Sequence, residues 1–191
     1  DITCHSASKY LSGHSDVVAG ALCCTRAMAE KIFQGEFMTL GGIISPQNAW
    51  LMLRGLRTLG VRLERVAHTT PIVVDFLEQH PKIERVIYPF STSFPQYDLA
   101  KEQMLQAGGM FSILLKTDEL AACERFVNAL KRFLLACSWG GHESLIFPIC
   151  ALYQSQNYAE SPLPFNFSRI YLGLEEPEVL IADLEQALEV V

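Results

Sequence analysis

The second half of the sequence alternates short apolar runs with longer amphipathic stretches, and this alternation limits the fold more than any other feature. Runs of roughly four to eight apolar, β-branched or aromatic residues are typical of strands, and apolar residues three or four apart are typical of helices. The predicted strands are 83–88, 110–115, 133–137 and 167–172, the predicted helices are 97–105, 118–130 and 177–190, and residues 148–164 are a predicted loop with a short helix. The mixture predicts a two-layer α/β sandwich, with helices on one face of a sheet.

The first part of the chain predicts a strand followed by helices. Residues 17–24 form a continuous run of small apolar side chains, which is typical of a strand buried on both faces, and Thr25 then opens a helical stretch that reaches Phe33. Ser45 and Pro46 predict the start of a long helix, because serine caps helix N-termini and proline fits the first helical turn.

This long helix is the predicted link between two domains. Its apolar residues recur at spacings of three and four and form one stripe, while four arginines lie on other faces. Pro71 is expected to kink or restart the helix, with Thr70 as the new cap. We place the domain boundary in this helix, so that residues 1–55 end a large domain and include the start of the linking helix, and residues 56–191 form a C-terminal α/β domain.

The composition favours an oligomeric protein that acts on a small molecule. Half of the 191 residues are hydrophobic and only 19% are charged, so we expect part of the apolar surface to meet another subunit or a segment outside this sequence. The net charge of −6 and the absence of a Lys/Arg cluster interleaved with aromatic residues argue against nucleic acid or an anionic membrane as a partner.

The cysteines and histidines form no metal or redox motif. The six cysteines include no Cys-x-x-Cys pair, and most lie in apolar runs where a thiol behaves as a small hydrophobic group, so we expect reduced thiols. His5, His14 and His142 lack the short paired spacing of catalytic zinc motifs, so we expect no metal. Reduced thiols indicate a cytoplasmic protein, and because the chain has no run long enough to span a bilayer and starts without the features of a signal peptide, we expect a soluble one.

Residues 5–16 surround one lysine, Lys9, with small hydroxyl residues. An ε-amine attacks a carbonyl only when it is uncharged, whereas serine O–H and backbone N–H groups take up the charge of a phosphate. The pattern is typical of a covalent site for an aldehyde cofactor that carries a phosphate, namely pyridoxal 5′-phosphate. On spacing alone, a plain surface loop gives the same pattern.

Two further segments carry candidate substrate-binding residues. Residues 137–145 predict a strand that enters a glycine turn and leaves the Ser138 hydroxyl in a cleft, although a plain turn has the same pattern. Arg169 lies on a predicted strand between bulky neighbours. Its guanidinium can bind a substrate carboxylate through two parallel hydrogen bonds, or it can form a structural salt bridge.

Together these segments resemble the Cys/Met-metabolism family of pyridoxal-phosphate enzymes. The family's lysine motif reads His-Ser-Ala-Thr-Lys-Tyr-x-x-Gly-His-Ser-Asp, and residues 5–16 depart from it within the fixed positions only by Ser8 in place of Thr. Residues 53–59, 138–145 and 169–176 are similar to three further motifs of the family, in the same order. The resemblance therefore covers the whole sequence, and its ordered motifs are more specific than any one of them.

The resemblance implies an α/β fold that forms the C-terminal half of a fold-type-I pyridoxal-phosphate enzyme. Lys9 would bind the cofactor covalently and then act as a general base toward the substrate Cα, and the hydroxyls of Ser6 and Ser8 would bind the cofactor phosphate. An aspartate, a stacked aromatic ring and a glycine-rich phosphate turn of the family would lie before Asp1. We therefore expect the chain alone to be inactive, and we expect a homotetramer built from active dimers.

The resemblance also implies how an amino-acid substrate is held. Arg169 would bind its α-carboxylate with help from Ser138, and Trp139 would contact the substrate, while Glu143 belongs to the turn and is taken as structural. Because Trp139 is typical of the β-lyase members, we expect trans-sulfuration chemistry in methionine metabolism, with cystathionine split into homocysteine, pyruvate and ammonia. A γ-synthase or a γ-lyase is the alternative, and a non-catalytic interaction domain is a further one.

Overall fold

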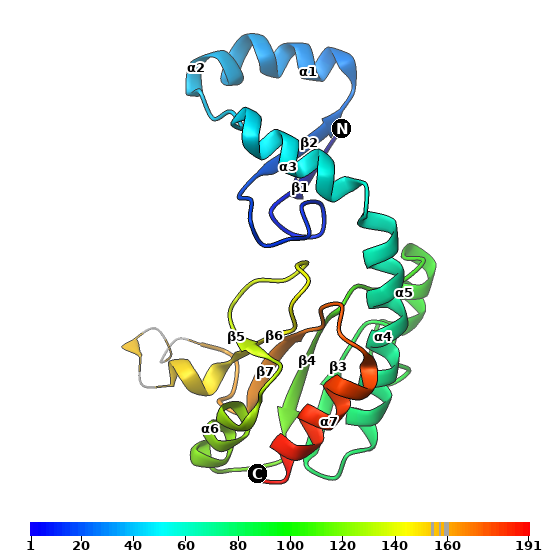
Figure 1. Ribbon diagram of the computed structural model, residues 1–191, viewed down its shortest axis with the longest axis vertical. Helices are drawn as coiled ribbons and strands as arrows, with labels where there is room; N and C mark the ends of the chain where they lie inside the picture. Colours follow the sequence, from blue (N-terminus) through cyan, green and yellow to red (C-terminus); the bar gives the residue numbers. More distant parts are fainter. Residues whose placement is uncertain (154, 157, 159–160) are drawn as a thin grey trace.

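The computed structural model describes residues 1–191 except 154, 157 and 159–160. Figure 1 shows two parts joined by a bent pair of helices, with the N-terminus in the upper part and the C-terminus in the lower part. We call residues 1–56 the N-terminal part and residues 59–191 the C-terminal domain. The expected boundary between residues 55 and 56 lies beside the bend.

The N-terminal part contains a two-stranded antiparallel sheet and a chain of helices. Its elements are β1 (Ile2–Ser6), β2 (Gly20–Cys24), α1 (Arg26–Ile32), the π-helix η1 (Phe33–Phe37), α2 (Met38–Leu40) and α3 (Pro46–Leu56). The predicted cap at Ser45 is confirmed, since its hydroxyl accepts from the N–H of Asn48. At Thr25, where a helical stretch was expected to open, the hydroxyl accepts from the N–H of Met28. The predicted strand over 17–24 is shorter, and most of its residues are exposed rather than buried on both faces.

The linking helix is broken at a place that the sequence pattern did not predict. α3 ends at Leu56 and α4 (Leu59–Gln79) begins after two residues, whose N–H groups donate back over three residues as in the last turn of a helix. The expected restart of the helix at Pro71 is wrong, because α4 continues through it, and Thr70 is not a cap, because its hydroxyl donates to the carbonyl of Val66 inside the same helix. Burial of Val73, Val74 and Leu77, which are at most 2% exposed, outweighs the roughly 3 kcal/mol that an interior proline costs.

The C-terminal domain is built on one five-stranded sheet in the order β3-β4-β7-β6-β5. Its elements are β3 (Ile83–Ile87), α5 (Tyr97–Gln103), β4 (Met110–Leu115), α6 (Leu120–Ala129), β5 (Leu134–Leu135), β6 (Leu145–Pro148), the 3-10 helix η2 (Ile149–Leu152), β7 (Phe167–Tyr171) and α7 (Pro177–Leu188). All neighbours are antiparallel except β5 and β6. Part of the predicted loop over 148–164 lies outside the described residues.

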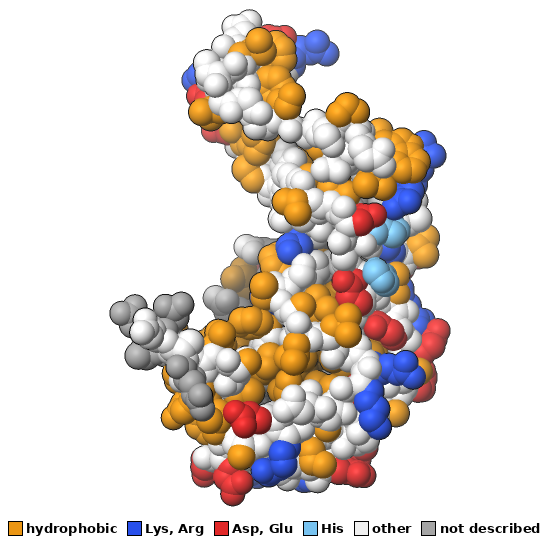
Figure 2. All heavy atoms as spheres, turned by 60° about the vertical axis from the view of Figure 1, so that its left-hand side comes forward, with side chains coloured by type: hydrophobic (Ala, Val, Ile, Leu, Met, Phe, Trp, Pro, Cys, Tyr) orange, Lys and Arg blue, Asp and Glu red, His pale blue; other side chains and the backbone are white. Residues whose placement is uncertain are grey.

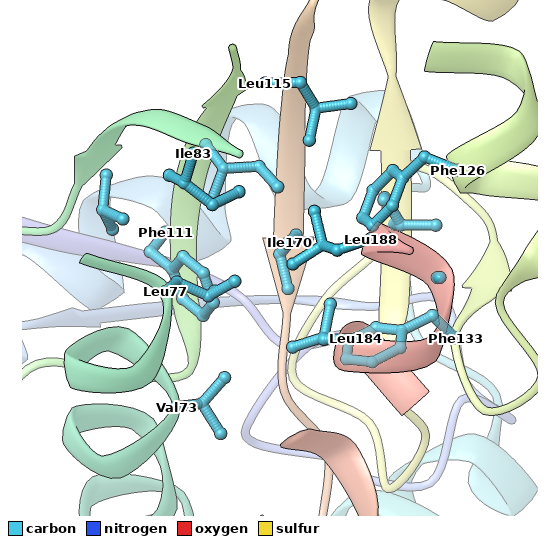
Figure 3. Packing of buried hydrophobic residues seen from close by; sticks show 14 of the residues in the cluster. Val73, Leu77, Ile83, Phe111, Leu115, Phe126, Phe133, Ile170, Leu184 and Leu188 are labelled. Carbon is cyan, nitrogen blue, oxygen red and sulfur yellow. The ribbon is translucent and has the colours of Figure 1, made fainter. Parts of the chain in front are cut away.

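The core of this domain lies between the sheet and helices α4, α6 and α7. Figure 3 shows Leu77 of α4, Phe126 of α6 and Leu184 of α7 pointing toward Ile170 of β7, and all four side chains are 0% exposed. β4 alternates between half-buried and fully buried residues, as a strand with one face on a core does. The predicted two-layer α/β sandwich is confirmed.

The opposite face of the same sheet carries Arg169. Ile170 and its partner Ile146 face the helices, so their neighbours Arg169 and Phe147, which pair in the ladder between β6 and β7, face the other way. The chain between β5 and β6, residues 136–144, contains the predicted glycine turn. The predicted strand over 133–137 is reduced to the two residues of β5, and β6 was not predicted.

The cysteines are more exposed than expected from the apolar runs in which most of them lie. Only Cys123 and Cys150 are buried, and burial raises the pKa of Cys123 to about 11, so that this thiol stays protonated. Cys4, Cys23 and Cys137 are exposed, and all six thiols are free. In the described part of the chain we find no cluster of three or more His, Cys, Asp or Glu side chains that could hold a metal, and no described helix is long and apolar enough to cross a bilayer.

Candidate active site

Lys9 lies where the two parts of the molecule meet. It belongs to the lysine loop, residues 7–19, which joins β1 to β2. Its ammonium Nζ donates a hydrogen bond of 2.8 Å to the hydroxyl of Ser138, a residue 129 positions later in the sequence. The structure therefore brings together two residues that the sequence predicted separately.

A cavity of about 400 Å³ opens beside this contact. Its lining combines the lysine loop with the chain that follows β5, and includes Ser8, Lys9, Ser15, Ser138 and Glu143. The volume is within the range of small-molecule sites, about 300–1,000 Å³. One amine, several hydroxyls and one carboxylate therefore face the same small space.

The ring of Trp139 lies against two cations. The centre of its ring is 4.4 Å from Nζ of Lys9 and 5.8 Å from the guanidinium carbon of Arg169. Phe147 lies on Arg169 as well, at 5.5 Å. Because aromatic faces attract cations, these rings hold both side chains in place without using their hydrogen-bond donors.

Most donors of Arg169 remain available to a ligand. One of its Nη atoms donates to the backbone oxygen of Ser138 at 3.5 Å, which is a long bond. Its Nε is buried and has no hydrogen-bond partner among the described residues, and no carboxylate pairs with Arg169 in that part of the chain. Nothing described here forms the structural salt bridge that was the alternative for Arg169, and a carboxylate ligand would satisfy the buried donor.

The two predicted phosphate-binding serines have different surroundings. Ser6 is exposed at the end of β1. The hydroxyl of Ser8 accepts from the N–H of Ala19 at 2.9 Å and donates to the carbonyl of Ala19 at 3.2 Å, which closes the lysine loop. Binding of a phosphate by Ser8 would compete with this donation, and the phosphate-binding role of both residues stays a prediction.

The glycine turn is needed for the lysine loop to approach. Gly140 has a φ of +82°, and a Cβ there would lie 2.5 Å from the backbone N of Tyr10 and 2.7 Å from the carbonyl carbon of Lys9. A Cβ on Gly141 would lie 2.3 Å from the hydroxyl oxygen of Ser15. Any larger residue would push the turn away from Lys9.

Glu143 ties the two segments together at the rim of the cavity. Its carboxylate accepts a hydrogen bond of 2.6 Å from the hydroxyl of Ser15, a residue with a φ of +58°, and lies 3.1 Å from Nδ1 of His142. Burial alone would raise the pKa of Glu143. Hydrogen bonds from Ser15 and from backbone N–H groups, together with the nearby His142, outweigh burial and lower this pKa.

Two further contacts, which the sequence pattern did not reveal, hold the glycine turn on the sheet. The carboxylate of Glu175 accepts from both the N–H and the hydroxyl of Ser144, at 3.0 and 2.8 Å. The hydroxyl of Tyr171 donates to the carbonyl of Gly141 at 3.0 Å, and its ring packs edge-on against Tyr10. Both contacts join residues about 30 positions apart, so no local pattern announces them.

Comparison with known proteins decides which family this site belongs to. Residues 1–189 match the sequence profile of the family described as Cys/Met metabolism PLP-dependent enzyme. The chain belongs to this family. Its fold is accordingly the C-terminal portion of a fold-type-I enzyme, and the cofactor of the family is pyridoxal 5′-phosphate.

The similar proteins catalyse different reactions. The chain is 40% identical to an L-methionine gamma-lyase of Pseudomonas deceptionensis, over 99% of the chain and 48% of that protein. It is 38% identical to an L-alanine/L-glutamate racemase of Wolbachia pipientis, over 98% of the chain and 47% of that protein, and 39% identical to a cystathionine beta-lyase of Coxiella burnetii, over 98% and 50%. The chain thus spans about half the length of these relatives.

The residues present fit the cofactor. A lysine amine lines a cavity large enough for a small aromatic phosphate, and hydroxyl groups share that lining. The orphaned Nε of Arg169 supplies a buried donor close by, as binding of an amino-acid carboxylate requires.

Proposed function

We propose that the complete protein containing this chain is a pyridoxal-phosphate-dependent carbon–sulfur lyase that acts on a sulfur-containing amino acid. The observation that carries the proposal is the meeting of Lys9 and Arg169 at one residue. The amine contacts the hydroxyl of Ser138, and the guanidinium contacts its backbone oxygen. A substrate gripped by Arg169 is thereby held near the amine that attacks carbonyls.

Each side chain has a defined task in this proposal. Lys9 would hold the cofactor through its amine, and the same amine would take the proton from the substrate Cα. Arg169 holds the α-carboxylate through its planar fork, and the hydroxyl of Ser138 assists, so that the Cα–H bond is held in one orientation. The bound cofactor supplies an electron sink for the bond that breaks at Cα.

For the finer reaction we propose β-elimination of cystathionine to homocysteine, pyruvate and ammonia. Support comes from Trp139, which is typical of the β-lyase members of the family and whose ring lies against both Lys9 and Arg169. γ-Elimination is the second candidate, and the similarity to a methionine gamma-lyase favours it.

We further propose that residues 1–55 and 56–191 belong to two domains, that Ser6 and Ser8 bind the cofactor phosphate, and that the protein works in the cytoplasm.

We also propose that the protein is a homotetramer. The large exposed side chains of α1, η1 and α3 support contact with further protein surface. They include Phe33, Phe37, Trp50 and Leu53, which are 41–62% exposed. Figure 2 shows hydrophobic side chains gathered on this part of the surface.

The first test is borohydride reduction of the complete protein with added pyridoxal phosphate, followed by peptide mapping. A pyridoxyl group on Lys9 is the expected result. Its absence from Lys9 would contradict the proposal and favour a non-catalytic interaction domain, which also predicts that Lys9→Ala changes no activity.

A second measurement separates the reactions. Incubation with cystathionine is expected to release pyruvate, whereas 2-oxobutyrate would identify γ-elimination. If L-alanine yields D-alanine while neither keto acid forms, the lyase assignment is wrong and the protein resembles its racemase relative in activity.

A further inference from the structure

Helix α4 contains a buried arginine, Arg62, that the proposed chemistry does not use. The sequence pattern placed it on a face away from the apolar stripe, yet it is only 7% exposed. No carboxylate pairs with it in the described part of the chain. Burying a guanidinium without a counter-charge is unfavourable, so its hydrogen bonds must compensate for the water that it loses.

The guanidinium of Arg62 donates hydrogen bonds to three neutral oxygens. One Nη donates to the carbonyl of Tyr10 at 2.8 Å, and the other donates to the carbonyl of Gly55 at 2.9 Å. Nε donates to the hydroxyl of Thr58 at 3.1 Å. Tyr10 follows Lys9 directly, whereas Gly55 lies in the last turn of α3 and Thr58 lies in the break between α3 and α4. One planar group thus joins the lysine loop to the bend between the two parts of the molecule.

The lysine loop is shaped around this guanidinium. Gly13 has a φ of +69°, and a Cβ on it would lie only 2.0 Å from an Nη atom of Arg62. The N–H of Gly13 donates to the carbonyl of Lys9 at 2.8 Å. A Cβ on Gly55 would likewise lie 2.2 Å from the carbonyl oxygen of Ser12. Gly13 therefore allows the loop to approach Arg62, and Gly55 allows it to approach the end of α3.

We propose that Arg62 is a positioning residue for Lys9. It fixes the backbone on the C-terminal side of Lys9, so that a long and flexible side chain starts from a defined point and its amine stays within reach of Ser138. This inference rests on the proposed function. Lysine cannot replace Arg62 fully, because a single ammonium lacks the planar fork that serves Tyr10 and Gly55 together.

The test compares Arg62 with Arg65, which lies on the same helix and pairs with Glu176 at 2.7 Å. Cofactor-free complete protein is mixed with pyridoxal phosphate, and the rate at which borohydride-trapped pyridoxyl-Lys9 accumulates is measured. Arg62→Met is expected to lower this rate at least about tenfold, since the carbonyl of Tyr10 loses its side-chain donor and the carbonyl of Gly55 is left with its contacts to Thr58. Arg62→Lys should give an intermediate rate, and the control Arg65→Met should stay within about twofold of the wild type.

Two further readouts separate positioning from general stability. Hydrogen exchange in Arg62→Met is expected to accelerate in residues 7–16 and to stay unchanged in β4, whose residues belong to the core. Steady-state release of keto acid is expected to show a lower kcat with KM within about threefold, because Arg169 and Ser138 are untouched.

The outcomes distinguish the inference from the function on which it rests. A wild-type protein that forms no adduct on Lys9 removes the proposed function itself. A normal wild type with Arg62→Met as fast as Arg65→Met overturns the inference alone. If Arg62→Met unfolds, Arg62→Lys and Gly13→Ala decide, since the latter keeps the arginine but displaces it from the loop. A Gly13→Ala protein that traps the cofactor at the wild-type rate also overturns the inference.

Discussion

The N-terminal part and the C-terminal domain differ in how much core each builds for itself. The N-terminal part buries only three hydrophobic residues of its own, Ala7, Val17 and Met52. The C-terminal domain buries an extensive cluster drawn from its sheet and from α4, α6 and α7. Yet Lys9, the proposed covalent lysine, lies on the part with little core, and Ser138 and Arg169, the proposed carboxylate-binding residues, lie on the part with a full one.

This difference shows that the position of Lys9 depends on contacts outside its own part. Ser138, Glu143 and Arg62 are among the residues of the other part that hold the lysine loop through hydrogen bonds. Arg169, the proposed carboxylate-binding residue, is instead held by a ladder of paired strands. The four predictions below test this division, beginning with the largest expected effect.

Removal of the lysine amine should destroy the chemistry and spare the fold. Lys9→Ala is expected to lower keto-acid release by at least about 10³-fold, because the general base and the covalent anchor are lost together. Its free energy of unfolding should change by less than about 1 kcal/mol, since the side chain is only half-buried. The exposed Lys131→Ala is the control. A Lys9→Ala protein with normal turnover would remove Lys9 from the mechanism.

Leucines from the two parts should have unequal effects in the isolated chain. Leu184→Ala is expected to lower the free energy of unfolding by about 2–5 kcal/mol, because the side chain is 0% exposed. Leu53→Ala should change it by less than about 0.5 kcal/mol, because that side chain is 62% exposed. Denaturant unfolding measures both. Equal losses would mean that the N-terminal part has a core that the structure does not show.

Substitution of the carboxylate fork should raise KM rather than unfold the domain. Arg169→Lys keeps the charge but loses the paired donors, so kcat/KM is expected to fall about 10- to 100-fold, chiefly through a higher KM. Steady-state kinetics with the substrate that the wild type turns over gives the value, and Arg132→Lys on the exposed surface is the control. If KM stays at the wild-type value, another residue binds the carboxylate.

The smallest predicted effect concerns Glu143 and depends on pH. Its pKa is lowered in the folded protein, so its contribution to stability is present above the unfolded pKa and disappears as the pH falls through the folded pKa. Glu143→Gln should therefore lower the free energy of unfolding by less than about 1 kcal/mol at neutral pH, seen as a slightly lower Tm. This deficit should shrink in acid. Thermal melts between neutral pH and pH 3 test it. A deficit that grows in acid would mean that the carboxyl binds its proton in the folded state.

Sequence reasoning found the parts of the fold that follow from local chemistry. The strand over 110–115 appears with the predicted bounds because its apolar residues alternate, and the caps at Thr25 and Ser45 form because a hydroxyl there satisfies the first turn. β1 and β6 were missed. β1 overlaps the start of the polar lysine motif, which does not have the apolar pattern of a strand. β6 has only four residues and comes directly after the glycine turn, so its apolar run was too short to indicate a strand.

The candidate site shows the same limit. Lys9, Ser138 and Arg169 were identified from their residue types and motifs, and the structure brings them together. Arg62 was not identified, because an arginine on an amphipathic helix is usually solvated. Its burial follows from the break beside Thr58 and from Gly13, which lies 49 positions earlier. Contacts of that range have no period that a sequence pattern can show.

The parallel pairing of β5 with β6 makes the chain over 136–144 a crossover segment that is held at both ends by the sheet. The segment begins at the end of β5 and ends at the start of β6, and these two strands are parallel neighbours in one sheet. The segment must therefore run back along the length of β5, and it also contacts the lysine loop. Each residue adds at most about 3.6 Å of reach. Because Ser138 lies on this segment, a deleted or inserted residue there is expected to shift Ser138 relative to Lys9, while the paired strands at both ends keep their register.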